Sequence, residues 1–487
     1  MAEQRLFMLS ARGLQWITSF VRAFILGLNC LSVGGTCARA EAVPATFARD
    51  DRIGVCTHFA QNWSVEQVMP LLAKSGAGWI RDEIYWKELE PTRGNYQVPS
   101  KTKGWIQAAR RAGLKVLLVL AYGNPVYADQ YDTAAYAKAA GWLAREVANG
   151  VQAIEILNEP NNFGFRDLYG GWWNGNEPNG SVSPYLQKYL QILNTAAKEI
   201  KLANPQMTVI GLGAPAPASF RMIALGLAPQ VDGLTDHPYG GDLPELVAYA
   251  ATPSLIKRDG IATADANGTF ASQVSMFRAQ AKKWGATDKL WHTEWGYSTV
   301  QATPGKPGMS EETQAVYILR RLLESDAAGI EHTFIYDFKD EGVDLYAEGE
   351  NFGLVHNDCS PKPAYFALQQ AAGLLAGTRT TPSTKQASVG NDPPVEKDGL
   401  GYRCHTFSGP DEQRTVVAFW NARPWDANAV TPNAVVTLPL TYEPRHVFLY
   451  DLLSRKQTEV PWKRLEDDRV AITVSITCAP QLLIVRS

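Results

Sequence analysis

Short apolar runs alternate with amphipathic stretches between about residue 50 and residue 375. Most of the runs are almost continuously hydrophobic, which is typical of parallel strands buried on both faces. The stretches between them repeat apolar residues at helical spacing, so a strand–helix unit recurs along the chain. The expected strands are residues 53–58, 78–84, 115–121, 153–158, 207–213, 233–237, 289–294 and 332–337.

Eight strand–helix units in this length predict an α/β fold, a (β/α)8 TIM barrel with enlarged loops, over residues 45–377. An open, doubly wound sheet is the alternative, but no glycine-rich phosphate loop follows the first expected strand. The clearest expected helices are residues 64–74, 134–148, 185–202, 272–283 and 311–327.

The pattern changes after Gly377. Residues 378–400 are rich in Thr, Ser, Pro, Asn and Asp, as linkers and irregular loops are. Short alternating runs follow, without a helix of useful length, and predict an antiparallel β-sandwich domain over residues 378–487. These runs are residues 414–420, 434–438, 445–450, 469–476 and 481–485.

Composition narrows the function classes only slightly. A chain of 487 residues fits one large domain and a smaller one. The net charge is −3 and no run of Lys and Arg suggests a basic groove, so we expect no nucleic-acid partner. The 14 tryptophans suit either a core or a cleft in which aromatic faces pack on sugar rings, and composition does not choose between the two.

The N-terminus resembles a targeting segment. Arg5 and Arg12 precede an apolar stretch over residues 16–31, and small residues ending Ala38-Arg39-Ala40 form a cleavage pattern. Arg22 interrupts the apolar stretch, so this stretch is a poor candidate for a membrane span. We predict a signal peptide over residues 1–40, no membrane span in the mature chain, and export to the periplasm or the exterior. An uncleaved anchor is the alternative.

Four cysteines remain after residue 40, and an even number in an exported chain permits disulfides. Cys404 and Cys478 lie in the same C-terminal region and are one expected pair. Cys56 and Cys359 lie near the first and last barrel strands, which are neighbours in a closed barrel. Four free thiols are the alternative. No Cys/His cluster is present, so we expect no metal and no cofactor.

Two glutamates stand where apolar strands end. Glu159 follows the fourth strand and Glu294 ends the seventh. In a barrel of this type, catalytic groups come from the C-terminal ends of the strands. Glycoside hydrolysis needs two carboxyl groups beside one bond, one protonated and one ionised. A lone glutamate here would be read as a solvated loop residue, but the pair on opposite strands favours catalysis.

The residues around this pair resemble the retaining glycosidases of clan A, in particular glycoside hydrolase family 39 and related bacterial enzymes that cleave exopolysaccharides. The resemblance covers about residues 50–375 in order. The eighth strand departs from it, because Tyr336 stands where many members have Trp, and this leaves the identity of the bound sugar open. The matching segments are Trp79-Ile80-Arg81-Asp82, Asn158-Glu159-Pro160, Asp236-His237-Pro238-Tyr239, Thr293-Glu294-Trp295-Gly296 and Asn351-Phe352-Gly353-Leu354-Val355.

The resemblance implies a role for each matching residue. Glu159 would be the general acid and then the general base, and Glu294 the nucleophile. Asn158 would hold the sugar 2-hydroxyl, Arg81 would keep Glu294 ionised, and Tyr239 would hydrogen-bond the nucleophile. The insertion at residues 163–184 would contact substrate, with a plain surface loop as the alternative. Further expected substrate contacts are His58, His237, Trp86, Trp295 and Tyr336.

The function implied is a retaining β-glycosidase that hydrolyses O-glycosidic bonds of an extracellular polysaccharide or its oligosaccharides, acting as a monomer. Three alternatives stay open at this point. One is a transglycosylase on the same scaffold, another is a non-catalytic carbohydrate-binding protein in exopolysaccharide assembly, and the third is a metal-dependent hydrolase.

Overall fold

The computed structural model describes residues 48–486 except 163, 241–242, 383–384, 391–399, 411–413, 430, 441 and 467. The expected signal peptide at residues 1–40 lies outside the described residues. Among the described residues, no helix has both the length and the apolar character needed to cross a membrane.

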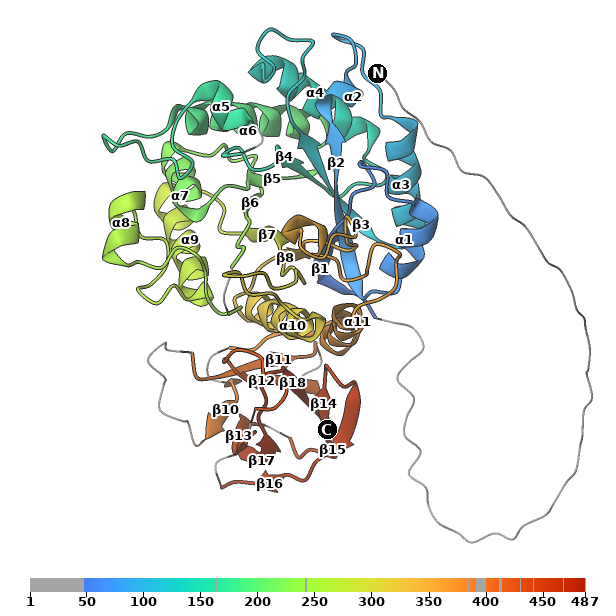
Figure 1. Ribbon diagram of the computed structural model, residues 1–487, viewed down its shortest axis with the longest axis vertical. Helices are drawn as coiled ribbons and strands as arrows, with labels where there is room; N and C mark the ends of the chain where they lie inside the picture. The colour runs from blue at the N-terminus through green and yellow to red at the C-terminus, as the bar shows by residue number, and fades with distance from the viewer. Residues whose placement is uncertain are drawn as a thin grey trace, which may run out of the picture. The chain divides into compact units, whose positions relative to one another are not determined.

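Eight parallel strands close into a barrel, with β1 hydrogen-bonded to β8, so the expected fold class is confirmed (Figure 1). The expected strands agree with the observed ones to within a few residues at each end. The third agrees at both ends, where Lys115 opens an otherwise apolar run. The strands are β1 (Asp50–Cys56), β2 (Ala77–Tyr85), β3 (Lys115–Ala121), β4 (Ala153–Ile156), β5 (Thr208–Leu212), β6 (Gly233–Asp236), β7 (Leu290–Trp295) and β8 (His332–Ile335).

Helices surround the barrel (Figure 1). Several begin at a Ser, Thr or Asp side chain that accepts a backbone N–H of the first turn, as at Ser64, Asp132, Thr269 and Ser310. The helices are α1 (Val65–Leu72), α2 (Trp86–Leu89), α3 (Ser100–Arg111), α4 (Thr133–Glu146), α5 (Phe165–Tyr169), α6 (Pro184–Ala203), α7 (Ala216–Leu225), α8 (Pro253–Asp259), α9 (Phe270–Trp284), α10 (Glu311–Ala327) and α11 (Pro363–Leu375), with a 3₁₀ turn at η1 (Glu348–Glu350).

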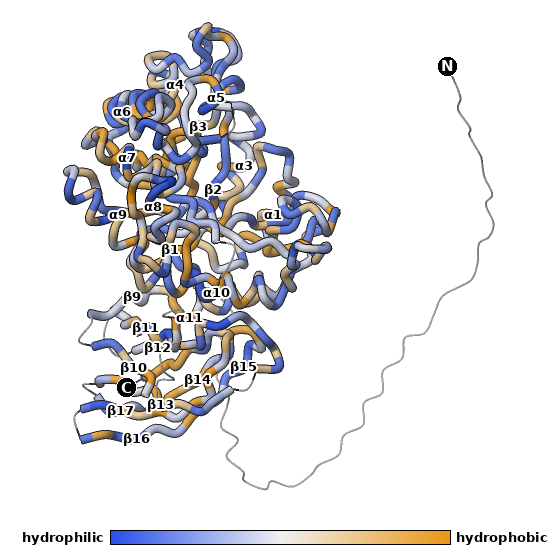
Figure 2. Tube along the Cα trace, turned by 60° about the vertical axis from the view of Figure 1, so that its left-hand side comes forward, coloured by the Kyte–Doolittle hydropathy of each residue, from blue (hydrophilic) through white to orange (hydrophobic). Residues whose placement is uncertain are grey.

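The barrel interior is layered, because alternate residues of each strand point inward. The lower layer is apolar and packs as one cluster, consisting of Cys56, Trp79, Leu117, Ala153, Ile210, Trp291 and Phe334. Two residues further along three of these strands, the inward positions are the polar residues Arg81, Glu155 and Thr293. Hydrophobic positions otherwise gather between the barrel strands and the helices around them, and between the C-terminal sheets (Figure 2).

Two antiparallel sheets form the C-terminal region, in the orders β10-β13-β17-β16 and β15-β14-β18-β12-β11-β9. All five expected runs are strands. The sequence pattern missed β9, β10, β11, β15 and β16. The longest of these is β11, whose residues are mostly polar and only partly buried. The strands are β9 (Arg379–Thr380), β10 (Ser388–Gly390), β11 (Tyr402–Ser408), β12 (Arg414–Asn421), β13 (Asn433–Pro439), β14 (His446–Asp451), β15 (Lys456–Glu459), β16 (Lys463–Arg464), β17 (Arg469–Ser475) and β18 (Gln481–Arg486).

The sandwich packs on α10, and buried charges cross the contact. Arg320 of α10 forms an ion pair of 2.6 Å with Glu245, and both side chains are almost fully buried. The indole of Trp420 in β12 donates to the same carboxylate at 2.7 Å. Glu324, also on α10, accepts from Arg403 in β11 at 2.6 Å. Side chains of the sandwich thus donate hydrogen bonds to buried carboxylates of the barrel.

The expected disulfides are not formed, because all four cysteines of the described chain are free. Cys56 points toward β7, where its Sγ lies 3.4 Å from the carbonyl oxygen of Thr293. Cys404 packs against the sandwich core, and burial raises the pKa of its thiol to about 12. The side chains therefore point to separate surroundings rather than to one another.

Candidate active site

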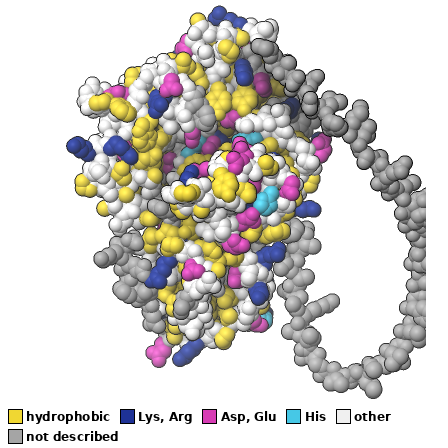
Figure 3. Space-filling model, in the orientation of Figure 1, with side chains coloured by type: hydrophobic (Ala, Val, Ile, Leu, Met, Phe, Trp, Pro, Cys, Tyr) yellow, Lys and Arg dark blue, Asp and Glu magenta, His cyan; other side chains and the backbone are white. Residues whose placement is uncertain are grey.

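Glu159 and Glu294 meet at the mouth of the barrel, where an oxygen of each lies within 4.8 Å of the other. Glu159 follows β4 on a tight turn, with φ of 61° at Leu157 and 40° at Glu159 itself. Such values are uncommon for residues other than glycine and cluster at functional sites. Figure 3 shows acidic and histidine side chains gathered near the middle of the barrel in this view.

A register shift in β7 places Glu294. The pairing of β7 with β8 is irregular between His292 and Trp295, the segment that carries Thr293 and Glu294. An irregularity of this kind redirects side chains at the end of a strand. Thr293 points into the barrel, where its hydroxyl donates to Glu155 at 2.9 Å, and Glu294 turns to the mouth.

Arg81 of β2 holds the site together. Its guanidinium donates to Glu294 at 2.7 Å, to Glu155 at 2.8 Å and to the side-chain oxygen of Asn158 at 3.0 Å. Arg81 is 4% exposed, so these charges interact in a poorly solvated place. The charges of Glu155 and Glu294 raise the pKa of Arg81 against the opposing effect of burial, so the cation is permanent.

The other oxygen of Glu294 accepts from the hydroxyl of Tyr239, at 3.2 Å. Tyr239 lies three residues beyond β6, so the strand-end pattern correctly brings it to the mouth. With Arg81 on one oxygen and Tyr239 on the other, the Glu294 carboxylate has a fixed orientation. Both donors stabilise its ionised form.

His237 connects the two glutamates. Its Nδ1 lies 2.9 Å from Glu159 and 3.7 Å from Glu294, and its Nε2 lies 3.1 Å from the Thr293 hydroxyl. Burial alone would lower the pKa of His237, but the charge of Glu294 and the bond to Glu159 raise it to about 9. Burial would likewise raise the pKa of Glu159, yet the hydrogen bond and charge of His237 lower it. The His237–Glu159 pair therefore holds one proton near neutral pH.

This pair predicts a loss of stability at high pH. An unfolded histidine has a pKa of about 6.5. Since the folded value of about 9 is higher, the contribution of His237 is complete below about pH 6.5 and is lost as the pH rises through 9. Urea unfolding at pH 6 and pH 10 is expected to show a drop on the order of 3 kcal/mol that His237→Asn lacks. An equal drop in both proteins would contradict the assignment.

Two expected substrate contacts, Trp86 and Trp295, need correction, because both side chains are buried in the core. Trp86 stacks on Tyr127 at 5.3 Å and donates to Glu90. Trp295 lies at the end of the irregular segment of β7, so the alternation that carries Thr293 into the barrel does not extend to it. Its indole packs in the core and donates to the Thr333 hydroxyl at 2.6 Å.

His58 and Tyr336, which follow β1 and β8, form another wall of the mouth. Their rings meet edge to face at 5.6 Å, and the Tyr336 hydroxyl donates to Glu341 at 2.9 Å. The His58 Nε2 atom lies 3.1 Å from Glu341. The centre of the Tyr336 ring also lies 6.3 Å from that of Tyr239, so this wall continues to Tyr239, the hydrogen-bond partner of Glu294. The peptide bond from Tyr336 to Asp337 is cis.

Sequence reasoning missed Glu155, Thr293 and Glu83. Glu155 is the one charged residue of β4, and a charge inside a buried strand is itself a signal of a polar network. Glu83 of β2 accepts from the hydroxyl of Tyr122 at 3.5 Å, and burial raises its pKa to about 7. Glu83 follows Arg81 by two residues and points the same way, so period-two spacing identifies it.

Two groups of described side chains bring three possible metal-ligand atoms within 4.8 Å of one another. One consists of Glu159, His237 and Glu294, in which a cation would occupy the space between the two glutamates. The other consists of His58, Asp337 and Glu341. Asp337 is fully buried, and burial raises the pKa of its carboxyl well above its usual range.

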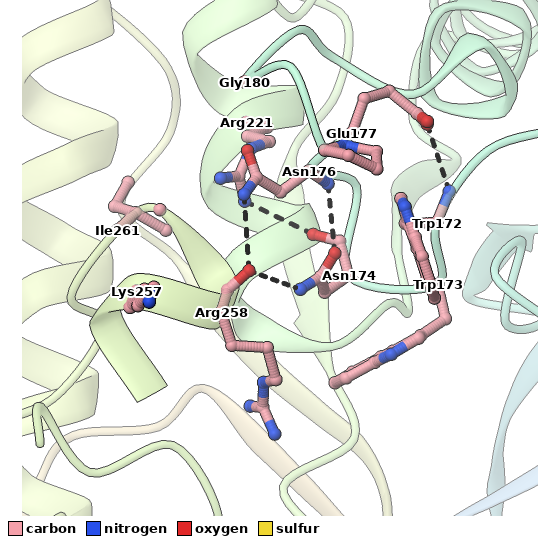
Figure 4. A pocket seen from close by; sticks show the side chains of 12 residues that line it. Trp172, Trp173, Asn174, Asn176, Glu177, Gly180, Arg221, Lys257, Arg258 and Ile261 are labelled. Atoms are coloured by element: carbon pink, nitrogen blue, oxygen red, sulfur yellow. Dashed lines mark hydrogen bonds between the residues drawn. The ribbon is translucent and has the colours of Figure 1, made fainter. Parts of the chain in front are cut away.

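The insertion after β4 encloses a second hollow, a pocket of about 770 Å³ between it, α7 and α8. Figure 4 shows Trp172 and Trp173 on one side of this insertion pocket, with Lys257 and Ile261 across from them. Asn174 ties the insertion to α8 by donating to Asp259 at 2.8 Å. The insertion is therefore held against α8 and forms one wall of the pocket. Its first expected residue, 163, lies outside the described residues.

A TIM barrel with a glutamate just after β4 and another at the end of β7 is the arrangement expected from the resemblance to clan A glycoside hydrolases. Comparison with solved structures agrees, although the chain matches no family model and no curated protein. The structure is similar to a family 39 glycoside hydrolase from the gut symbiont Bacteroides cellulosilyticus WH2, at 21% identity and a TM-score of 0.66, covering 91% of this chain and 82% of that one.

Two further solved structures share the fold. A glucosidase from Croceicoccus marinus is 13% identical with a TM-score of 0.56, and a monomeric β-xylosidase from Caulobacter crescentus CB15 is 16% identical with a TM-score of 0.52. Each covers 90% of this chain and 96% of its own. At these identities the likeness establishes the fold, and at that level it confirms the resemblance seen in the sequence.

Proposed function

We propose that this protein is a retaining β-glycosidase that hydrolyses O-glycosidic bonds of an extracellular polysaccharide or its oligosaccharides. The observation that carries the proposal is the pairing of Glu159 and Glu294, whose nearest oxygens lie within 4.8 Å. Retaining enzymes hold their carboxyl groups about 5–5.5 Å apart, whereas inverting enzymes need about 6.5–9.5 Å to admit a water molecule between them. The short spacing favours retention.

The two glutamates have unlike surroundings, which suit unlike roles. Glu294 bears the Arg81 and Tyr239 hydrogen bonds that keep it ionised, so it attacks the anomeric carbon. Glu159 shares a proton with His237 and delivers it to the departing glycosidic oxygen as that bond breaks. In the second step Glu159 takes a proton from water, whose oxygen displaces Glu294 from the anomeric carbon.

The polymer substrate and the place of action belong to the same proposal. The N-terminal pattern at residues 1–40 supports export, and a walled, aromatic mouth suits a sugar chain. One solved structure of similar fold is a β-xylosidase, which supports a β-linked substrate. We propose that the protein acts as a monomer and without a cofactor.

The test is a screen of polysaccharides and aryl β-glycosides, with the anomeric configuration of the first product followed by proton NMR. Retention is expected. An inverted first product would contradict the mechanism, and binding without turnover across the panel would favour a carbohydrate-binding protein instead. Adding an acceptor sugar separates hydrolysis from transfer, because a transglycosylase passes the glycosyl group from Glu294 to that sugar rather than to water.

A further inference from the structure

The insertion pocket contains cations that the described residues do not neutralise. Arg221 donates to the carbonyl oxygens of Asn174, at 3.3 Å, and of Pro217, at 3.0 Å, and also to that of Asp259. No described carboxylate lies within ion-pair distance of the Arg221 guanidinium. Burial lowers the pKa of Arg221, and the charge of the neighbouring Asp259 offsets this effect only in part.

The acidic side chains of the pocket already have partners. Asp259 is bound by Arg258 through two bonds of 2.7 Å. Glu177 accepts from the backbone of Trp172 at 3.1 Å and from the hydroxyl of Ser183. The exposed Lys257 adds a second positive charge at the rim. The pocket therefore has an excess of positive charge, which favours an anionic ligand.

An aromatic surface stands next to these cations. Trp172 is 53% exposed, although an indole is usually covered when a partner is available. Trp173 beside it carries the Arg258 guanidinium over its ring at 5.2 Å, which orients that cation. An exposed indole face next to unpaired cations matches a sugar ring that bears a carboxylate.

The pocket is formed by segments that follow β4, β5 and β6 in the chain. The insertion that forms it directly follows Glu159, the residue proposed to protonate the leaving oxygen. Trp173 packs at 6.4 Å against Tyr249, and the charge of Glu159 is among those that raise the pKa of Tyr249. Trp173 and Tyr249 thus form an aromatic surface that extends from the insertion pocket toward the proposed acid/base residue.

We infer that the insertion pocket binds an acidic sugar residue, a uronic acid or another carboxylate-bearing sugar, on the leaving-group side of the substrate. Arg221 and Lys257 receive the carboxylate, and Trp172 supports the ring face. The inference rests on the proposed function, because it takes the pocket as part of the same substrate path. It narrows the substrate class to anionic polysaccharides.

The experiment measures binding in a Glu159→Gln background, so that turnover does not intervene. Native electrophoresis is run through gels containing polygalacturonate, alginate or hyaluronan, and through gels containing neutral hydroxyethyl cellulose. At least one polyuronate is expected to retard the protein more strongly than the neutral polymer, and added salt to weaken this retardation. Lys257→Glu is expected to lower the affinity about tenfold, as reversal of a contacting charge does.

Lys103→Glu is the matched control, because it makes the same charge change at an exposed position of α3, on another helix of the barrel. Equal losses in Lys257→Glu and Lys103→Glu, or no preference for any of the three polyuronates, would overturn the inference. A wild-type protein that hydrolyses neutral β-glycosides but binds no polyuronate would sink this inference alone and leave the proposed function intact. Trp172→Ala provides a second variant, expected to weaken polyuronate binding without a charge change.

Discussion

Glu294→Gln is expected to reduce turnover of the best substrate by at least about 10⁴-fold, as loss of a nucleophile does in other enzymes. Glutamine has the shape of glutamate, so Arg81 and Tyr239 keep a neighbour of the same size. It has no negative charge with which to attack the anomeric carbon. Single-turnover kinetics and thermal unfolding, compared with the wild type, are the measurements. Glu146→Gln, an exposed position on α4, is the matched control.

Rescue by azide separates the two roles. In Glu294→Gly, azide enters the space of the missing carboxylate, attacks the anomeric carbon directly and gives a glycosyl azide of inverted configuration. In Glu159→Ala the glycosyl ester still forms on Glu294, and azide displaces it to give a retained product. The opposite pair of configurations would exchange the roles, and full activity of either variant without azide would remove that residue from the mechanism.

Arg81→Met is expected to lower the free energy of unfolding by about 3–5 kcal/mol, the usual cost of removing one partner of a buried ion pair. The loss is large because Arg81 neutralises both Glu155 and Glu294, and each would remain buried without its cation. Turnover is also expected to fall, because Glu294 loses the guanidinium that fixes its orientation. Urea unfolding at pH 7 measures the stability.

Two comparisons make this result specific. Arg110→Met, at an exposed position of α3, is expected to change stability little. Adding Glu155→Gln to Arg81→Met is expected to restore part of the lost stability, because one of the two uncompensated charges is then gone. If the double variant were less stable than Arg81→Met alone, the account of the network in terms of charge would be wrong.

The sequence predicted the parts of this molecule in which one physical factor dominates. Most barrel strands are predominantly apolar, and β3, which is apolar after its first residue Lys115, was located at both ends. In β11 the polar residues Arg403 and His405 bind Glu324 on α10. The strand therefore lacks the apolar pattern by which it would be recognised. Its identification requires knowledge of that distant partner.

The same distinction, between what the local pattern shows and what depends on a distant partner, holds in the candidate active site. Arg81, Asn158 and Tyr239 were placed correctly at the mouth because each stands in or just after a strand that ends there. The bridge from His237 to Glu159 depends on how two loops approach each other, and strand spacing does not contain that information. Trp295 was misplaced because the pairing of β7 with β8 is irregular between His292 and Trp295, and the sequence pattern does not reveal that irregularity.

The contact between α10 and the sandwich has an evolutionary consequence. The charge of Glu324 on the barrel side is stabilised by Arg403 and His405 on the sandwich side, which hold the pKa of this buried carboxyl at about 2. A recombination event joining this barrel to a foreign C-terminal region would leave that acid buried without its cations. Gene exchange is therefore expected to transmit the barrel and its sandwich together as one inherited unit, and new specificities to arise by change within the insertion after β4.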